Sequence, residues 1–128
     1  MDSDELKKRT KAFVLAIIKV GQSLPKNVGS DVLCKQLLRS ATSAGANYRS
    51  ACRSRSKADF ISKITIVEEE ADEAAYWPEL LMESGIQDNN ELRRLRIEAE
   101  ELTRIFVASG KTAKRNKNNP QSQIRNPR

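Results

Sequence analysis

Apolar and small side chains recur along this chain in alternating steps of four and three residues, and this spacing constrains the fold more than any other feature. The first stretch runs through Leu6, Thr10, Phe13, Ile17, Val20 and Leu24. A later one runs through Phe60, Ile64, Val67, Ala71, Ala74, Pro78 and Leu81. Such spacing places these residues on one face of an α-helix and predicts helices that pack lengthwise along a shared seam.

Capping and breaking residues divide this pattern into four segments. Either Ser30 or Asp31 can begin the second helix, and Gly110 is placed to cap the fourth. The helices are predicted over about 3–24, 30–53, 56–84 and 89–109. Joined by short loops, they predict an all-α fold, a single up-down-up-down antiparallel four-helix bundle over residues 1–110. Residues 111–128 contain one strong hydrophobe and are predicted to form a disordered basic tail.

Three positions inside the predicted helices are unusual. Gly45 costs a helix about 1 kcal/mol relative to alanine, which predicts the close approach of a neighbouring helix. Pro78 predicts a bend near residues 74–77, with the helix continuing to about Glu83. Asn47 lies near the seam, either as a partly exposed surface residue, as a buried polar group that fixes helix register, or in a ligand site; we favour the register role.

Composition argues against most enzymes. The chain has no histidine, which removes histidine acid–base catalysis, the usual catalytic triads and the common zinc sites. The sequence also lacks a glycine-rich phosphate loop and a nucleophile–base pair. We therefore expect a non-enzymatic protein with no cofactor, no metal and no small-molecule substrate. The charged N-terminus and the lack of a long apolar run predict a cytoplasmic protein without a membrane segment.

Positive charge is concentrated at one end of the predicted bundle. Residues 1–110 hold 17 Lys/Arg (23 minus the six in 111–128) and all 17 Asp/Glu, so the net charge of +6 belongs to the tail. An antiparallel bundle brings four helix ends to one end of the molecule. These are the start of the first helix, the end of the second, the start of the third and the end of the fourth. The nucleic-acid-binding candidates at that end and in the tail are Lys7, Lys8, Arg9, Lys11, Arg49, Arg53, Arg55, Lys57, Lys111, Lys114, Arg115 and Lys117.

This arrangement suits electrostatic contact with RNA or DNA phosphates, and nucleic-acid binding is our leading prediction. A solvated charged end and an acidic protein partner are the alternatives. Residues 64–101 hold twelve acidic and three arginine residues. That acidic face of the third and fourth helices gives the second functional prediction, a protein-interaction scaffold of unknown partner.

Several large hydrophobes lie off the predicted seams: Val14, Ile18, Leu38, Ile61, Trp77, Met82, Ile97 and Ile105. Exposed together they would form a patch, and a patch of that size predicts self-association. The predicted homo-oligomer interface includes Leu38, Ile61, Trp77 and Met82.

Three adjacent motifs carry a family resemblance. They lie in residues 37–77, LLRSATSAGANYRSACRSRSKADFISKITIVEEEADEAAYW. This stretch resembles the core of the ribosomal RNA intervening-sequence proteins of bacteria, a family similar to the accessory protein of diversity-generating retroelements. The resemblance extends over residues 5–107. The positions that match the family motifs are Arg39, Ser40, Asn47, Tyr48, Phe60, Glu70, Glu73 and Trp77.

The resemblance implies a four-helix bundle that assembles as a homopentamer and has no enzymatic activity. By analogy with the retroelement accessory protein, it also implies nucleic acid and a reverse transcriptase as partners.

Overall fold

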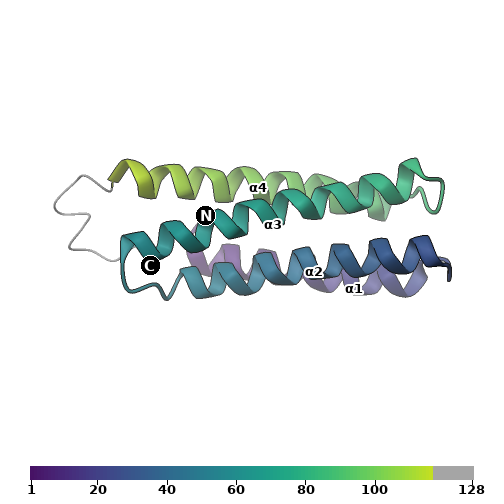
Figure 1. Cartoon of the computed structure of the whole chain (residues 1–128), viewed down its shortest axis with the longest axis horizontal. Helices are drawn as coiled ribbons and strands as arrows, with labels where there is room; N and C mark the ends of the chain where they lie inside the picture. The colour runs from purple at the N-terminus through teal and green to yellow at the C-terminus, as the bar shows by residue number, and fades with distance from the viewer. Residues whose placement is uncertain (117–128) are drawn as a thin grey trace.

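Four α-helices make up the fold. The computed structural model describes residues 1–116, with α1 at Ser3–Ser23, α2 at Val28–Ala51, α3 at Lys57–Glu83 and α4 at Asn90–Asn116. The helices lie lengthwise, and each runs antiparallel to the one before it (Figure 1). This confirms the predicted up-down-up-down bundle. The beginnings of α1 and α3 and the ends of α2 and α4 share one end of the molecule, which we call the basic end.

Short polar side chains fix where each helix starts. The Asp2 carboxylate accepts a hydrogen bond from the Glu5 amide at 2.8 Å, and Ser56 Oγ accepts one from the Asp59 amide at 3.1 Å. The predicted start of the second helix is wrong. Asn27, not Ser30 or Asp31, caps α2, because its side-chain oxygen accepts the Ser30 amide at 2.8 Å and the helix then begins at Val28.

The end of α4 also differs from the prediction. The helix continues through Gly110 to Asn116, so residues 111–116 are not part of a disordered tail; Lys117 and the rest of the predicted tail lie outside the described residues. Gly110 is buried because α3 passes close by, and a Cβ there would lie 3.1 Å from Glu68 Oε1. Ala113 is only 5% exposed, so packing on the bundle holds the last turns.

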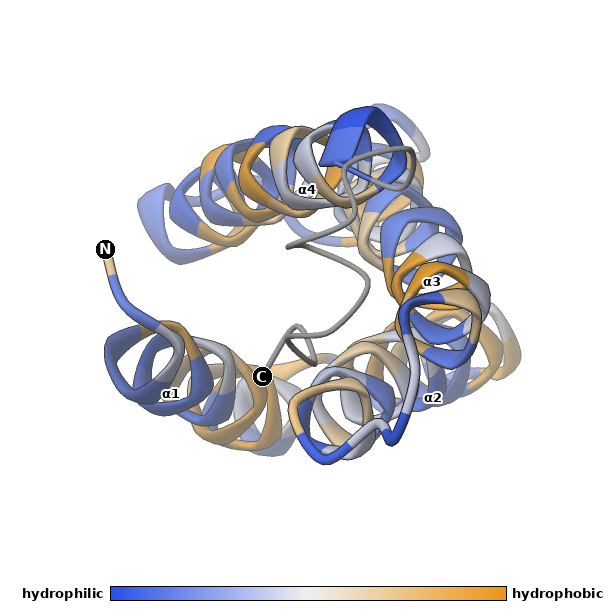
Figure 2. Cartoon of the chain, turned by 90° about the vertical axis from the view of Figure 1, so that its left-hand side faces the viewer, coloured by the Kyte–Doolittle hydropathy of each residue, from blue (hydrophilic) through white to orange (hydrophobic). Residues whose placement is uncertain are grey.

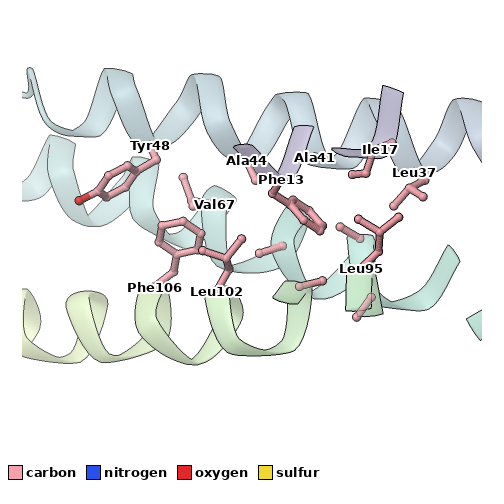
Figure 3. Close-up of a cluster of buried hydrophobic side chains, with 14 of the residues drawn as sticks. Phe13, Ile17, Leu37, Ala41, Ala44, Tyr48, Val67, Leu95, Leu102 and Phe106 are labelled. Atoms are coloured by element: carbon pink, nitrogen blue, oxygen red, sulfur yellow. The ribbon is translucent and has the colours of Figure 1, made fainter. Parts of the chain in front are cut away.

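The predicted seams form the core. The seam residues from Leu6 to Leu24 are all buried, and those from Phe60 to Leu81 are all buried except for the half-buried Phe60. Figure 3 shows a cluster of these core residues, in which the rings of Tyr48 and Phe106 pack at a tilt of 44° with their centroids 5.2 Å apart. Pro78 is buried within α3, which continues to Glu83 as expected.

The helices are not packed evenly around the core. Figure 2, which looks along the bundle, shows α2, α3 and α4 in an arc, with α1 beside α2. The contact between α1 and α4 is sparser than those between consecutive helices. Close packing of α1 on α2 occurs where the sequence predicts it, since a Cβ at Gly45 would lie 3.3 Å from Thr10 Cγ2.

A polar network joins α2 to α3. Arg39 Nη1 donates to Glu70 Oε2 at 3.1 Å, and Arg39 Nη2 donates to Glu73. The buried Ser40 hydroxyl lies 3.1 Å from Glu73 Oε1 and accepts a hydrogen bond of 3.1 Å from Trp77 Nε1. Five of the positions that carry the family resemblance therefore meet in a single cross-helix contact.

Candidate nucleic-acid interface

A groove between α1 and α2 gathers much of the predicted basic surface. This α1–α2 groove, at the basic end, has a volume of about 520 Å³. Its lining residues are Lys7, Lys8, Lys11, Val14, Thr42, Gly45, Ala46, Arg49 and Arg53. Five of these nine carry a positive charge and none is acidic. The groove is therefore suited to an anion with several charges.

Helix geometry explains how the cations converge. Lys7 and Lys11 are four residues apart on α1, so they lie on one face with a rise of about 6 Å. Arg49 lies in the last turn of α2, and Arg53 lies in the turn that directly follows the helix, where its amide donates to the Ser50 carbonyl at 3.0 Å. Between them, the small residues Thr42, Gly45 and Ala46 belong to α2. Their short side chains leave space between two cationic walls.

Acidic residues compete little for these cations. Lys7 Nζ lies 3.3 Å from Asp4 Oδ1, and this is an exposed pair in which Asp4 retains 82% of its side-chain exposure. Exposed pairs of this kind contribute about 0–1 kcal/mol, so a phosphate can readily replace the carboxylate. Lys8, Lys11, Arg49 and Arg53 are exposed.

Arg9, which was predicted to belong to this surface, lies elsewhere. Its Nε and Nη2 donate to the two carboxylate oxygens of Glu98 on α4, both at 2.6 Å, and Nη2 also donates to Glu101 at 3.3 Å. These carboxylates raise the Arg9 pKa above its ordinary value. Arg9 therefore links α1 to α4 where helix contact is sparse, and it does not line the groove.

The other predicted cations share the basic end but not the groove. Lys111 and Lys114 are near Glu68 of α3, whose pKa they lower against the larger effect of burial. The remaining members of this group are Arg55 in the α2–α3 loop, Lys57 at the start of α3 and Arg115 in the last turn of α4. Whether they contact nucleic acid stays a prediction.

The four residues predicted to form an oligomer interface are less exposed than the prediction requires. Leu38, Trp77 and Met82 are half-buried against the core of their own subunit, and Ile61 is half-buried as well. The large exposed hydrophobes of the helices are Leu15, Ile18, Val28, Val32, Ile66, Tyr76 and Ile97. Self-association stays a prediction, and these residues are better candidates for an interface than the four predicted ones.

Asn47 does not have the environment that a register role requires. It is half-buried, and its Nδ2 donates to O and Oγ of Ser43 at 2.9 and 3.1 Å. Both bonds lie within α2 and therefore fix no neighbouring helix. Ser40, Glu73 and Trp77 provide the buried cross-helix polar contact instead.

The described residues show neither a metal-binding cluster nor a membrane-spanning helix. Among residues 1–116, no cluster of three or more acidic or cysteine side chains is placed to bind a metal ion. None of the helices in this part of the chain has both the length and the apolar character required to span a bilayer.

Known proteins resemble this chain in both sequence and structure. A protein of unknown function from the S23 ribosomal protein family of Bacteroides thetaiotaomicron has a crystal structure that matches with a TM-score of 0.74. The two are 31% identical, and the match covers 83% of this chain and 98% of that one. No curated protein sequence matches. The family model described as 23S rRNA-intervening sequence protein matches residues 3–108, and the chain therefore belongs to that family.

Proposed function

We propose that this protein is a non-enzymatic RNA-binding bundle, which holds the phosphate backbone in the α1–α2 groove. The observation that carries the proposal is the convergence of five cations and no carboxylate on one groove of about 520 Å³. The family description refers to 23S rRNA, which makes RNA the first nucleic acid to test.

The lining also suggests how RNA would be recognised. No aromatic side chain lines the groove, so the groove provides no platform on which bases can stack. Its donors are lysine ammonium and arginine guanidinium groups, which pair with phosphate oxygens. Binding should therefore depend strongly on salt and weakly on base sequence.

Salt dependence provides a quantitative test. If each of the five groove cations neutralises one phosphate, log K should fall with log salt at a slope of about −3.5 for single strands or about −4.5 for a duplex. We would measure fluorescence anisotropy with labelled RNA from 50 to 200 mM salt, using single-stranded and duplex oligonucleotides. If neither the single-stranded nor the duplex RNA bound measurably at 50 mM salt, the proposal would be refuted.

Charge reversal would locate the contact. The double variant Arg49→Glu/Arg53→Glu should abolish binding at 100 mM salt. The matched control is Lys19→Glu/Lys26→Glu, which makes the same change in net charge at exposed positions outside the groove. Equal losses in the two variants would mean that net charge, and not the groove, drives binding. A chain ending at Asn116 would measure what residues 117–128 add.

The scaffold alternative receives less support. Glu70 and Glu73 on the acidic face of α3 are paired with Arg39, and Glu98 on α4 is paired with Arg9. These carboxylates already stabilise the bundle, which leaves fewer of them for a partner. A reverse transcriptase partner and pentamer formation stay predictions from the family resemblance.

A further inference from the structure

A second cationic groove lies on the other side of α2. This α2–α3 groove, of about 270 Å³, is lined by Ala46, Arg49, Ser50, Arg53 and Lys63. Ala46, Arg49 and Arg53 line both grooves, so the two are continuous across α2. As in the first groove, none of the lining residues is acidic.

We propose that the RNA backbone crosses α2 roughly at right angles to the helix axes, from the lysines of α1 to Lys63 of α3. This inference rests on the proposed function and adds a direction and a residue to it. Lys63 was not among the predicted nucleic-acid ligands, because its position in the sequence separates it from the basic runs near the helix ends. In the folded chain it shares a groove with Arg49 and Arg53.

Charge along the helices favours a crossing path over a path parallel to α1. Beyond Lys11 and Val14, α1 exposes Leu15 and Ile18, which are 59% and 43% exposed and attract no phosphate, and they separate the groove cations from Lys19, which lines neither groove. On the far side of α1, Arg9 is already neutralised by Glu98. The positive surface is therefore bounded along α1 and on its α4 side.

The path is bounded on α3 as well. Further along that helix lies a hollow lined by Arg39, Ile66, Glu69, Glu70 and Glu73. Three of its five lining residues are acidic, and Arg39 is occupied by Glu70 and Glu73. A phosphate chain leaving Lys63 in this direction would meet repulsion, so the favourable surface is a band across three helices.

The dimensions of the band suit a short length of backbone. Neighbouring helix axes are about 8–10 Å apart, so a band over α1, α2 and α3 spans about 16–20 Å. One strand of a DNA duplex presents a phosphate about every 3.4 Å along its axis, and at that spacing the span would hold about five or six phosphates. The two grooves together contain six cations, namely Lys7, Lys8, Lys11, Arg49, Arg53 and Lys63.

Lys63 is paired with an acidic residue, and removing that acidic charge should change RNA affinity in the opposite direction to removing the charge of Lys63. Its Nζ lies 3.2 Å from Asp59 Oδ2, one turn earlier on α3. A bound phosphate would take the place of that carboxylate and would be repelled by it. Removing the charge of Asp59 should therefore strengthen RNA binding, whereas removing the charge of Lys63 should weaken it.

The experiment compares Lys63→Gln, Asp59→Asn and Lys19→Gln in the full chain by anisotropy across salt. We expect Lys63→Gln to weaken RNA binding a few-fold and to make the slope of log K against log salt shallower by about one unit. We expect Asp59→Asn to tighten RNA binding a few-fold. Lys19 is exposed and lines neither groove, so its variant should lie close to wild type. Circular dichroism melts would verify that all three fold.

The results separate the path from the function. If wild type binds RNA but Lys63→Gln and Asp59→Asn both behave like Lys19→Gln, the crossing path is overturned and the proposed function stands. If wild type fails to bind at low salt, the proposed function fails first. Opposite shifts from Lys63→Gln and Asp59→Asn would support the path.

Discussion

Substituting Ser40 with alanine tests whether the α2–α3 network stabilises the fold. Ser40 is fully buried, and its hydroxyl accepts the Trp77 indole N–H at 3.1 Å. The substitution removes this acceptor and the contact with Glu73. An unsatisfied buried donor costs about 1–3 kcal/mol, and the higher helix propensity of alanine returns up to about 0.7 kcal/mol. Because Trp77 is half-buried and can reach some water, we expect a net loss of about 1–2 kcal/mol.

The assay is urea unfolding followed by helix circular dichroism, at one fixed protein concentration because assembly would shift the midpoint. A double-mutant cycle of Ser40→Ala with Trp77→Phe isolates the hydrogen bond, and we expect a coupling energy of about 1 kcal/mol. A coupling below about 0.3 kcal/mol would refute the reasoning, since the two residues would then act independently. Thr42→Ala is the control, because its hydroxyl is exposed and bonds only within α2.

Three further predictions concern α4 and the face it packs on. Phe106→Ala should cost about 3–5 kcal/mol in urea unfolding, because Phe106 is fully buried against Tyr48; a loss below 1 kcal/mol would contradict the packing. Gly110→Ala should raise the melting temperature, because the site is helical and the Glu68 carboxylate 3.1 Å away ends a flexible side chain that can move; a lower melting temperature would mean that it cannot. Burial raises the Glu68 pKa above 4.5, so its contribution to stability is largest below pH 4.5 and is lost as pH rises through the folded pKa. Glu68→Gln should therefore be more stable than wild type at pH 7, with the difference in unfolding free energy disappearing below pH 4.5; a difference independent of pH would refute this.

The bundle could be predicted from the sequence because the apolar spacing and the helix geometry share one period. The steps of four and three that run from Leu6 to Leu24 fix which face of α1 is buried, whatever lies opposite. Helix ends were less predictable. Several residues near a boundary can cap a helix: Asn27, Ser30 and Asp31 all have side chains suited to the N-cap, and only the folded chain shows that Asn27 takes that position.

The site was predictable only as a set of charges at one end. Antiparallel topology brings Lys7 and Arg53 to the same end, but it does not say which side of a helix each cation occupies relative to its neighbours. Arg9 differs from Lys8 by one position, about 100° around α1, and this turns it towards Glu98. Lys63 joins the basic surface only through the packing of α3 on α2.

The same packing explains why α2 carries both the family motif and the proposed interface. Its side towards α3 bears Ser40, whose hydroxyl meets Glu73 and Trp77 near the middle of the bundle. Its last turn bears Arg49, and the turn that follows it bears Arg53; both are exposed at the basic end, where they line both grooves. Residues of the motif therefore hold α2 against α3, and this contact keeps Arg49 and Arg53 beside Lys63. It follows that variants of the network should reduce stability first, whereas variants of the two arginines should reduce RNA binding with little effect on unfolding.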